Sequence, residues 1–129
     1  MADVTKAGTL TLTNQLVPAT NKLNLIAGEA IAAGDACYVK SDGKWWRSTG
    51  AAANAAAVVD GFALSAAAAG EALTCGWNLR LDYGSGLTIG ASYYLSTNAG
   101  AIADAASTGG TVVIARAIDA TRIEVRRSW

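Results

Sequence analysis

The chain has 129 residues, of which 29 are alanine and 14 are glycine, and its ten basic and ten acidic residues cancel to a formal net charge of zero. This length is enough for one domain that buries a core without disulfide or metal support. The neutral charge excludes a general electrostatic attraction to nucleic acid or to an anionic membrane, and it leaves little charge repulsion between copies.

The first part of the chain predicts a strand followed by an extended segment. Threonines alternate with leucines from Thr9 to Thr13, as on a strand with one buried face. Pro18, the one proline of the sequence, comes after this strand. We therefore expect residues 1–26 to form an N-terminal strand and an extended arm, and residues 27–129 to form the β domain.

Short strands joined by tight turns are predicted through the rest of the chain. Residues 38–40, 45–47 and 93–95 are short segments rich in aromatic or aliphatic residues, and turn residues bound them. Residues 41–44 contain the Asp-Gly pair that is typical of a tight hairpin. Further breaks are predicted at residues 83–86 and 107–110. This organisation favours an all-β fold, a small single-domain β-barrel or sandwich.

Alternation of apolar and polar residues is clearest between Leu73 and Leu81. It predicts one continuous strand with a buried and a solvent-facing side. Residues 122–126 alternate in the same way and predict the last strand. The alanine runs 51–57 and 66–69 have no large apolar residues at helical spacing, so we expect loops there, or at most one helical turn.

A weak repeat relates residues 31–64 to residues 87–118. In both parts a glycine precedes a tyrosine and an aliphatic residue, and an alanine followed by an aliphatic residue comes later. The matching residues are Ile31, Gly34, Tyr38, Val39, Val59, Ala63 and Leu64, then Leu87, Gly90, Tyr94, Leu95, Val113, Ala117 and Ile118. The repeat predicts two similar β units that pack their apolar faces together. The alternative is coincidence in a sequence rich in alanine and glycine.

Residues able to carry catalysis are scarce. The sequence has no histidine, which removes the commonest general base and metal ligand. Cys37 and Cys75 have no further cysteine or histidine at metal-binding spacing, and nothing nearby in sequence activates them as nucleophiles. They could form a disulfide, but two reduced core thiols are favoured because the sequence shows no sign of export.

The carboxylates are scattered, and Asp42 and Asp82 lie in turn contexts. A pair of carboxylates that meets in space would be the remaining route to acid–base catalysis. We therefore expect no catalytic residue, no metal and no cofactor, and a protein that is not an enzyme.

Neither a membrane nor nucleic acid is an expected partner. The sequence has no run of about 18 apolar residues that could span a bilayer, and no continuous apolar stretch follows its charged start as in a signal peptide. Arg116, Arg122, Arg126 and Arg127 gather near the C-terminus. Because Arg122 and Arg126 lie on the polar side of the predicted last strand, a solvated face is favoured over a nucleic-acid site.

Adjacent aromatic residues predict an interaction surface. Neighbours on a strand face opposite sides, so the core can take only one member of Trp45–Trp46 and one of Tyr93–Tyr94. Exposed tryptophan is enriched at interfaces; the alternative is that a loop or the N-terminal segment covers these rings. With the aliphatic residues of the N-terminal segment, the interface candidates are Val4, Leu10, Leu12, Leu16, Trp45, Trp46, Tyr93 and Trp129.

Three segments resemble bacteriophage capsid decoration (cement) proteins. Residues 30–39 resemble the family's "aGD-x-v-y" turn and strand, and residues 61–73 resemble its "vGfAl…a-a-G-e-x-v" segment. Residues 87–96 are similar to its "gLtpGa-x-yyls" segment, with Ile89 where proline is more usual. The resemblance covers about residues 28–120 and leaves out the N-terminal segment and the arginine-rich end.

This resemblance implies a compact β-barrel or sandwich without catalytic residues. Such a protein binds the outside of an expanded icosahedral head as a homotrimer and bridges neighbouring capsomers. The implied partner is the major capsid protein, and the implied location is the virion surface, after assembly in the host cytoplasm. The alternative function is a phage tail, fibre or adhesin-like β module that binds a receptor or a carbohydrate through exposed tryptophans.

We further expect the segment near Val4–Leu16 to act as an arm that lies along the shell or pairs with a neighbour's sheet edge. Deletion of residues 1–16 should then abolish head binding and leave a folded domain.

Overall fold

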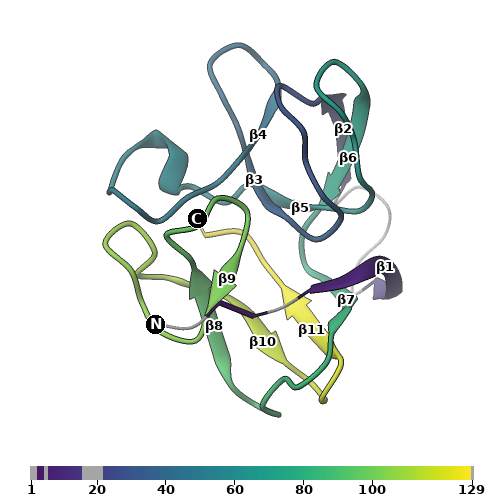
Figure 1. Cartoon of the computed structure of the whole chain (residues 1–129), viewed down its shortest axis with the longest axis vertical. Coiled ribbons are helices and arrows are strands. Elements are labelled where there is room, and N and C mark those ends of the chain that lie inside the picture. Colours follow the sequence, from purple (N-terminus) through teal and green to yellow (C-terminus); the bar gives the residue numbers. More distant parts are fainter. Residues whose placement is uncertain (1–2, 5, 16–21, 129) are drawn as a thin grey trace.

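The computed structural model describes residues 3–4, 6–15 and 22–128, and the side chains of residues 3–4 and 22–128. These residues form two antiparallel sheets (Figure 1) and one turn of 3-10 helix, η2 (Ala55–Ala57). The all-β class predicted from the sequence is confirmed. In the described part of the chain, no helix has the length and apolar character needed to cross a membrane.

The five-stranded sheet has the order β2-β6-β5-β3-β4, and the six-stranded sheet has the order β1-β7-β11-β10-β8-β9. The strands of the first sheet are β2 (Lys22–Ile26), β3 (Ala36–Val39), β4 (Trp45–Arg47), β5 (Gly61–Ala63) and β6 (Ala72–Gly76). Those of the second are β1 (Lys6–Gln15), β7 (Leu79–Gly84), β8 (Ser92–Leu95), β9 (Ile102–Ala103), β10 (Val113–Ala117) and β11 (Arg122–Val125).

One arrangement of five strands occurs twice in the chain. β2 to β6 take the same places in the first sheet, in chain order, as β7 to β11 take in the second. The turns before β3 and β8 also match, because Gly34 N donates to Ala63 O at 2.7 Å and Gly90 N donates to Ala117 O at 2.8 Å. Both glycines have positive φ, 88° and 80°. We call residues 22–76 unit 1 and residues 79–125 unit 2; the predicted repeat is confirmed.

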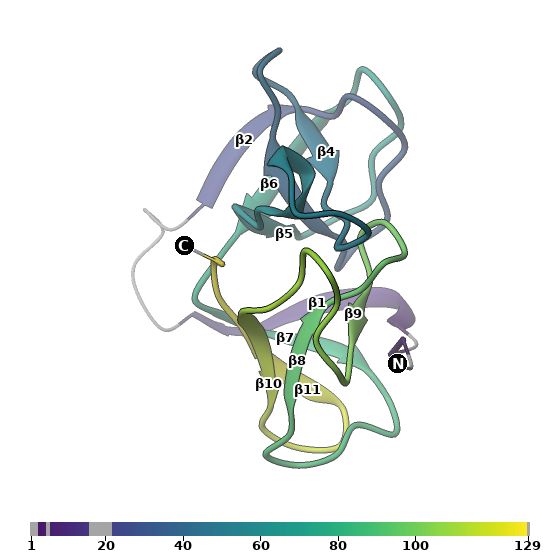
Figure 2. The same ribbon diagram turned by 90° about the vertical axis from the view of Figure 1, so that its left-hand side faces the viewer.

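The two units pack apolar residues together in one large cluster, as the repeat predicts, and unit 1 has a second, smaller cluster of its own. Unit 1 encloses a cluster around Trp45, Leu73 and the two cysteines. Unit 2 encloses a larger cluster around Tyr83, and Phe62 of β5 reaches into it from unit 1. Figure 2 shows unit 1 stacked above unit 2, with a separate group of strands in each. The larger cluster is therefore shared: Ala36 and Val59 of unit 1 also belong to it, and Phe62 is its largest side chain from that unit.

The predicted strand from Leu73 to Leu81 is divided between the two sheets. β6 ends at Gly76 and β7 begins at Leu79, and between them Asn78 has a left-handed φ of 55°. A Cβ on Gly76 would lie 2.3 Å from Cδ1 of Leu79, so the close passage there depends on glycine. Both strands have one buried side, so the apolar–polar alternation in the sequence continues across the break. The sequence pattern therefore does not indicate that the strand is divided.

The described part of the N-terminal segment lies along both edges of unit 2. β1 pairs antiparallel with β7, and Val4 N donates to Ile102 O at 3.0 Å on β9. In unit 1, the residues after β2 reach the opposite edge, where Gly28 N donates to Trp45 O at 2.8 Å. These bonds satisfy edge groups that would otherwise be open. The part of the expected arm that the structure describes is paired within the same chain, Leu16 lies outside the described residues, and the division at residue 26 stays a prediction.

Most local turn predictions are confirmed, but the break predicted at residues 83–86 begins only after Gly84, the last residue of β7. The hairpin between β3 and β4 turns at Gly43 with φ 77°, and the Asp42 carboxylate accepts a hydrogen bond from Lys44 N at 3.0 Å. The alanine run 51–57 is a loop that ends in η2, which Asn54 caps by accepting from Ala56 N at 3.0 Å. The second run, 66–69, is a loop with one bridging residue.

A substitution of Tyr83 should test the core of unit 2. Its side chain is fully buried, its hydroxyl has no hydrogen-bond partner among the described residues, and burial raises its pKa above the ordinary value. Since an unpaired buried hydroxyl is costly, Tyr83→Phe should keep the free energy of unfolding or raise it by about 1 kcal/mol.

The same variant should also tolerate alkali better than the wild type. The fold favours the neutral phenol of Tyr83. Its contribution to the free energy of unfolding is therefore complete below the unfolded pKa of about 10 and is lost as the pH rises above that value. Denaturant unfolding at neutral and alkaline pH measures both effects. A loss of stability at neutral pH would mean that the hydroxyl has a partner after all.

Candidate interaction surface

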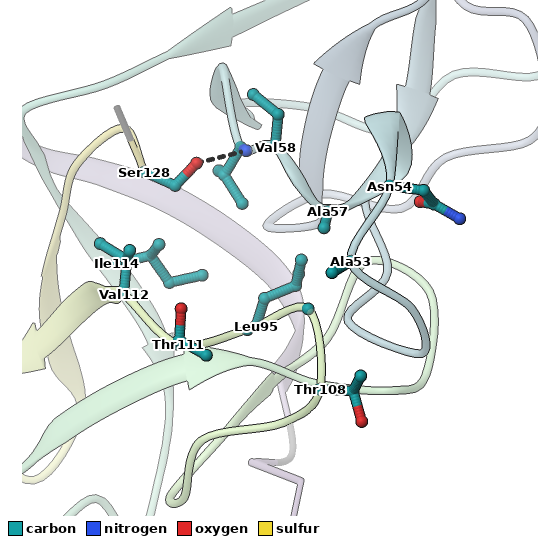
Figure 3. A pocket seen from close by; sticks show the side chains of 13 residues that line it. Ala53, Asn54, Ala57, Val58, Leu95, Thr108, Thr111, Val112, Ile114 and Ser128 are labelled. Carbon is teal, nitrogen blue, oxygen red and sulfur yellow. Dashed lines mark hydrogen bonds between the residues drawn. The ribbon is translucent and has the colours of Figure 1, made fainter.

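A pocket of about 280 Å³ lies where equivalent loops of the two units meet. One loop is residues 51–58, before β5, and the other is residues 107–112, before β10. In Figure 3, Ala53, Ala57 and Val58 line one side, Thr111 and Val112 line the other, and Leu95 lies between them. The C-terminal residues close one end, where Ser128 Oγ accepts a hydrogen bond from Val59 N at 2.8 Å.

Small residues bring the two loops together. Gly109 N donates to Gly50 O at 2.9 Å, and a Cβ on Gly109 would lie 2.3 Å from the carbonyl oxygen of Ala52. Ser107 Oγ donates to Leu95 O at 2.8 Å and fixes the second loop to β8. The pocket is therefore shaped by backbone contacts before any ligand arrives.

The chemistry of this pocket suits apolar binding. Among the residues that line it, none has a charged or titratable side chain. Val58 and Val112 are 37% and 48% exposed, and they occupy equivalent positions of the sequence repeat. A site of this kind can receive an aliphatic or aromatic side chain, but it offers no acid, base or nucleophile other than hydroxyl groups.

The carboxylates that line two other pockets are engaged within the chain. Asp3 and Asp104 line a pocket of about 390 Å³, where the Asp3 carboxylate accepts hydrogen bonds from Ser96 Oγ and Asn98 Nδ2. Asp60 lines a pocket of about 360 Å³ and accepts from Val39 N at 2.8 Å. Over residues 3–4 and 22–128, no group of three metal-binding side chains is placed to hold an ion.

The aromatic pairs follow strand alternation, and the structure decides which member of each pair is buried. Trp45 is fully buried in unit 1, and Tyr93 is 4% exposed in unit 2. Trp46 and Tyr94 are the half-buried members. Trp45 and Tyr93 are therefore corrected from interface candidates to core residues, because their strands turn these side chains toward the apolar clusters.

The indole of Trp46 is occupied by contacts within the chain. Its Nε1 donates to the Asp42 carboxylate at 3.1 Å, and Lys40 Nζ lies 4.4 Å from the ring centroid. A Cβ on Gly28 would lie 2.2 Å from Trp46 Cε2, so the ring rests on that glycine. Trp77 is engaged as well, since the Arg127 guanidinium lies 3.7 Å from its ring centroid.

The remaining interface candidates lie in the N-terminal segment and at Trp129. Val4 is half-buried and packs against the cluster of unit 2. Leu10 and Leu12 lie on β1, of which the structure describes only the backbone, whereas Leu16 and Trp129 lie outside the described residues. Sequence reasoning missed the exposed aliphatic residues, which are Leu23, Ile26, Val39, Val58, Ile89 and Val112. The repeat could have indicated Val58 and Val112, since it aligns them.

The comparisons add no relative. No family model matches the chain, and a search of curated proteins finds no match. The resemblance to capsid decoration proteins therefore rests on the three sequence segments alone.

Cys37 and Cys75 are free thiols, and both are fully buried in unit 1, as the sequence favoured. A hydrogen bond with Cys75 and burial raise the pKa of Cys37 well above its ordinary value. Because the thiolate is the reactive form, a thiol reagent at pH 8 should label neither residue in the folded protein and both after unfolding. Rapid labelling under native conditions would contradict this assignment.

Proposed function

We propose that the protein is a capsid decoration protein, which binds the outer surface of an expanded phage head and stabilises it by bridging capsomers. The sequence resemblance supports this proposal. The structural observation that carries it is the preformed, uncharged pocket with Val58 and Val112 exposed beside it. A surface of this kind suits a protein that works by binding, with the major capsid protein as its partner.

Stabilisation in this proposal is a matter of mass action. A protein that binds only the expanded shell stabilises it by its binding free energy. Full burial of an exposed valine side chain contributes roughly 1.5 kcal/mol. Val58 and Val112 are 37% and 48% exposed, so covering both would contribute on the order of 1.5 kcal/mol together. The two units present equivalent loops at this face, which suits contact with two neighbouring capsid subunits.

A tail, fibre or adhesin-like module remains the alternative and has less support. Carbohydrate binding by a tryptophan needs an open ring face. Trp45 is buried, and the rings of Trp46 and Trp77 are covered by Lys40 and Arg127. None of the tryptophans at residues 22–128 is thus a ready sugar platform.

The number of copies in the virion is the first test. Quantitative mass spectrometry of purified particles should find hundreds of copies for a protein spread over the shell, in ratio to the major capsid protein. A handful of copies would move the protein to the tail or a unique vertex, and absence from the particle would refute the proposal. The homotrimer stays a prediction that the mass of the free protein can test.

A charge placed at the rim should weaken head binding. Val112→Lys puts an ammonium group beside an uncharged pocket. We therefore expect the affinity of the protein for expanded heads to fall at least about tenfold. Ile89→Lys is the matched control, because Ile89 is 71% exposed and does not line the pocket. Equal losses in both variants, or no loss in either, would exclude this face as the contact.

A further inference from the structure

Within the described parts of the chain, no strand lies on the outer side of β2 at residues 22–24. β2 lies at the margin of unit 1 (Figure 2), and among the described residues Lys22–Ile26 pair with β6 alone. Ala27 N donates toward the β6 side, to Glu71 O at 2.8 Å, whereas Gly28 N donates to the opposite side. Backbone groups of successive residues point to alternate sides of a strand. The N–H and C=O groups of Lys22 and Asn24 therefore point away from β6.

The same edge exposes aliphatic side chains. Leu23 is 41% exposed and Ile26 is 42% exposed, although Leu25 between them packs against the core of unit 1. An edge strand with open backbone groups and exposed aliphatic residues readily pairs with another strand. Only one charged residue, Lys22, lies on β2, so little charge opposes such pairing.

The internal repeat shows that the corresponding edge of unit 2 is covered. β7 takes the place of β2 in that unit, and its outer edge pairs with β1 of the same chain. The described residues thus contain two edges of this kind and one strand, β1, that covers an edge. Two copies can satisfy the edges left over by placing their β2 strands side by side, while each β1 stays on its own β7.

We propose that β2 is a self-association site that pairs antiparallel with β2 of a second copy of this chain. In this pairing Leu23 lies opposite Leu23 of the second copy, so the two leucine side chains meet. The outward backbone N–H and C=O groups of Lys22 exchange hydrogen bonds with those of Asn24 of the second copy. The two Lys22 residues do not face each other. The contact is isologous and closes with two molecules, and it goes beyond the proposed function because it does not involve the shell.

The strength of this contact follows from its size. Stable interfaces bury about 1,200 Å² or more in total, and one pair of short strands buries less. We therefore expect a dimer that forms reversibly as the concentration rises. Within a larger oligomer built by another surface, the same contact would join one oligomer to the next.

Sedimentation velocity over a wide range of protein concentration tests the proposal. Asn24→Pro removes an outward N–H and leaves the bonds to β6 in place, so its dissociation constant should be at least about tenfold higher. Asn24→Ala keeps the backbone groups and should associate like the wild type. A wild type that does not associate beyond its smallest species at any concentration would overturn the proposal, as would a folded Asn24→Pro protein whose concentration-dependent association equals that of the wild type.

Disulfide trapping gives a readout that does not depend on proline being tolerated. In the proposed register the two Leu23 Cα atoms are about 4.5 Å apart, within the range for a disulfide. Leu23→Cys should therefore form a covalent dimer under mild oxidation, while Cys37 and Cys75 remain buried. Ile89→Cys, also on the surface, is the control. Cross-linking of Leu23→Cys no faster than that of the control would contradict the pairing.

Discussion

Replacement of Phe62 with alanine is expected to lower the free energy of unfolding by about 3–5 kcal/mol. Phe62 is fully buried, and it extends from β5 of unit 1 into the cluster of unit 2. The variant loses the transfer free energy of the ring and leaves a cavity between the units. Thermal unfolding should show the melting temperature lowered by about 10 °C or more.

The form of this transition is as informative as its midpoint. If Phe62 joins the units, the wild type should unfold in one thermal transition. The transition of Phe62→Ala should then be broader or should separate into two. Val39→Ala is a control on the same unit, because Val39 is 37% exposed and such surface changes cost about 0.5 kcal/mol or less. A small loss from Phe62→Ala, close to that of the control, would mean that the units do not share this core.

Removal of residues 1–15 is expected to destabilise the whole domain, in contrast to the expectation that a folded domain remains. The deletion takes β1 from β7 and the bond of Val4 N from β9, so both edges of unit 2 open together. Several hydrogen bonds between strands are lost, each worth about 0.5–1.5 kcal/mol. The free energy of unfolding should therefore fall by about 3 kcal/mol. Size-exclusion chromatography should show aggregation through the exposed edges.

A shorter deletion provides the control. Removal of residues 1–2 leaves Val4 and β1 in place and should keep the melting temperature of the full chain. A monomeric protein of unchanged stability after removal of residues 1–15 would restore the idea of a dispensable arm. Any test of head binding with the truncated chain needs this measurement first, because an unfolded protein would also fail to bind.

Local patterns in the sequence were enough for the all-β class and for most turns. Asp42 and Gly43 indicated the β3–β4 hairpin because their conformational preferences act within a few residues. The repeat indicated two similar units, since glycines and aliphatic residues recur where the same turns and strands recur. The absence of histidine, a property of composition alone, removed the commonest general base and metal ligand from the candidate residues.

The candidate surface was harder to predict. Alternation showed that one member of Trp45–Trp46 and one of Tyr93–Tyr94 would be buried, but either choice satisfies the pattern. The pocket beside Val58 and Val112 forms only when loops from both units meet, so no single segment of sequence contains it.

The sequence by itself thus determined the strand content, the turns and the internal repeat, because these depend on neighbours along the chain. Only the tertiary structure decided that the chain changes sheets near Asn78, that β1 covers β7, and that β2 pairs with β6 alone among the described strands. Strand pairing joins residues far apart in sequence, and a period of two is the same whichever strand lies alongside. The physical reason is that alternation specifies a buried face, but not the partner that buries it.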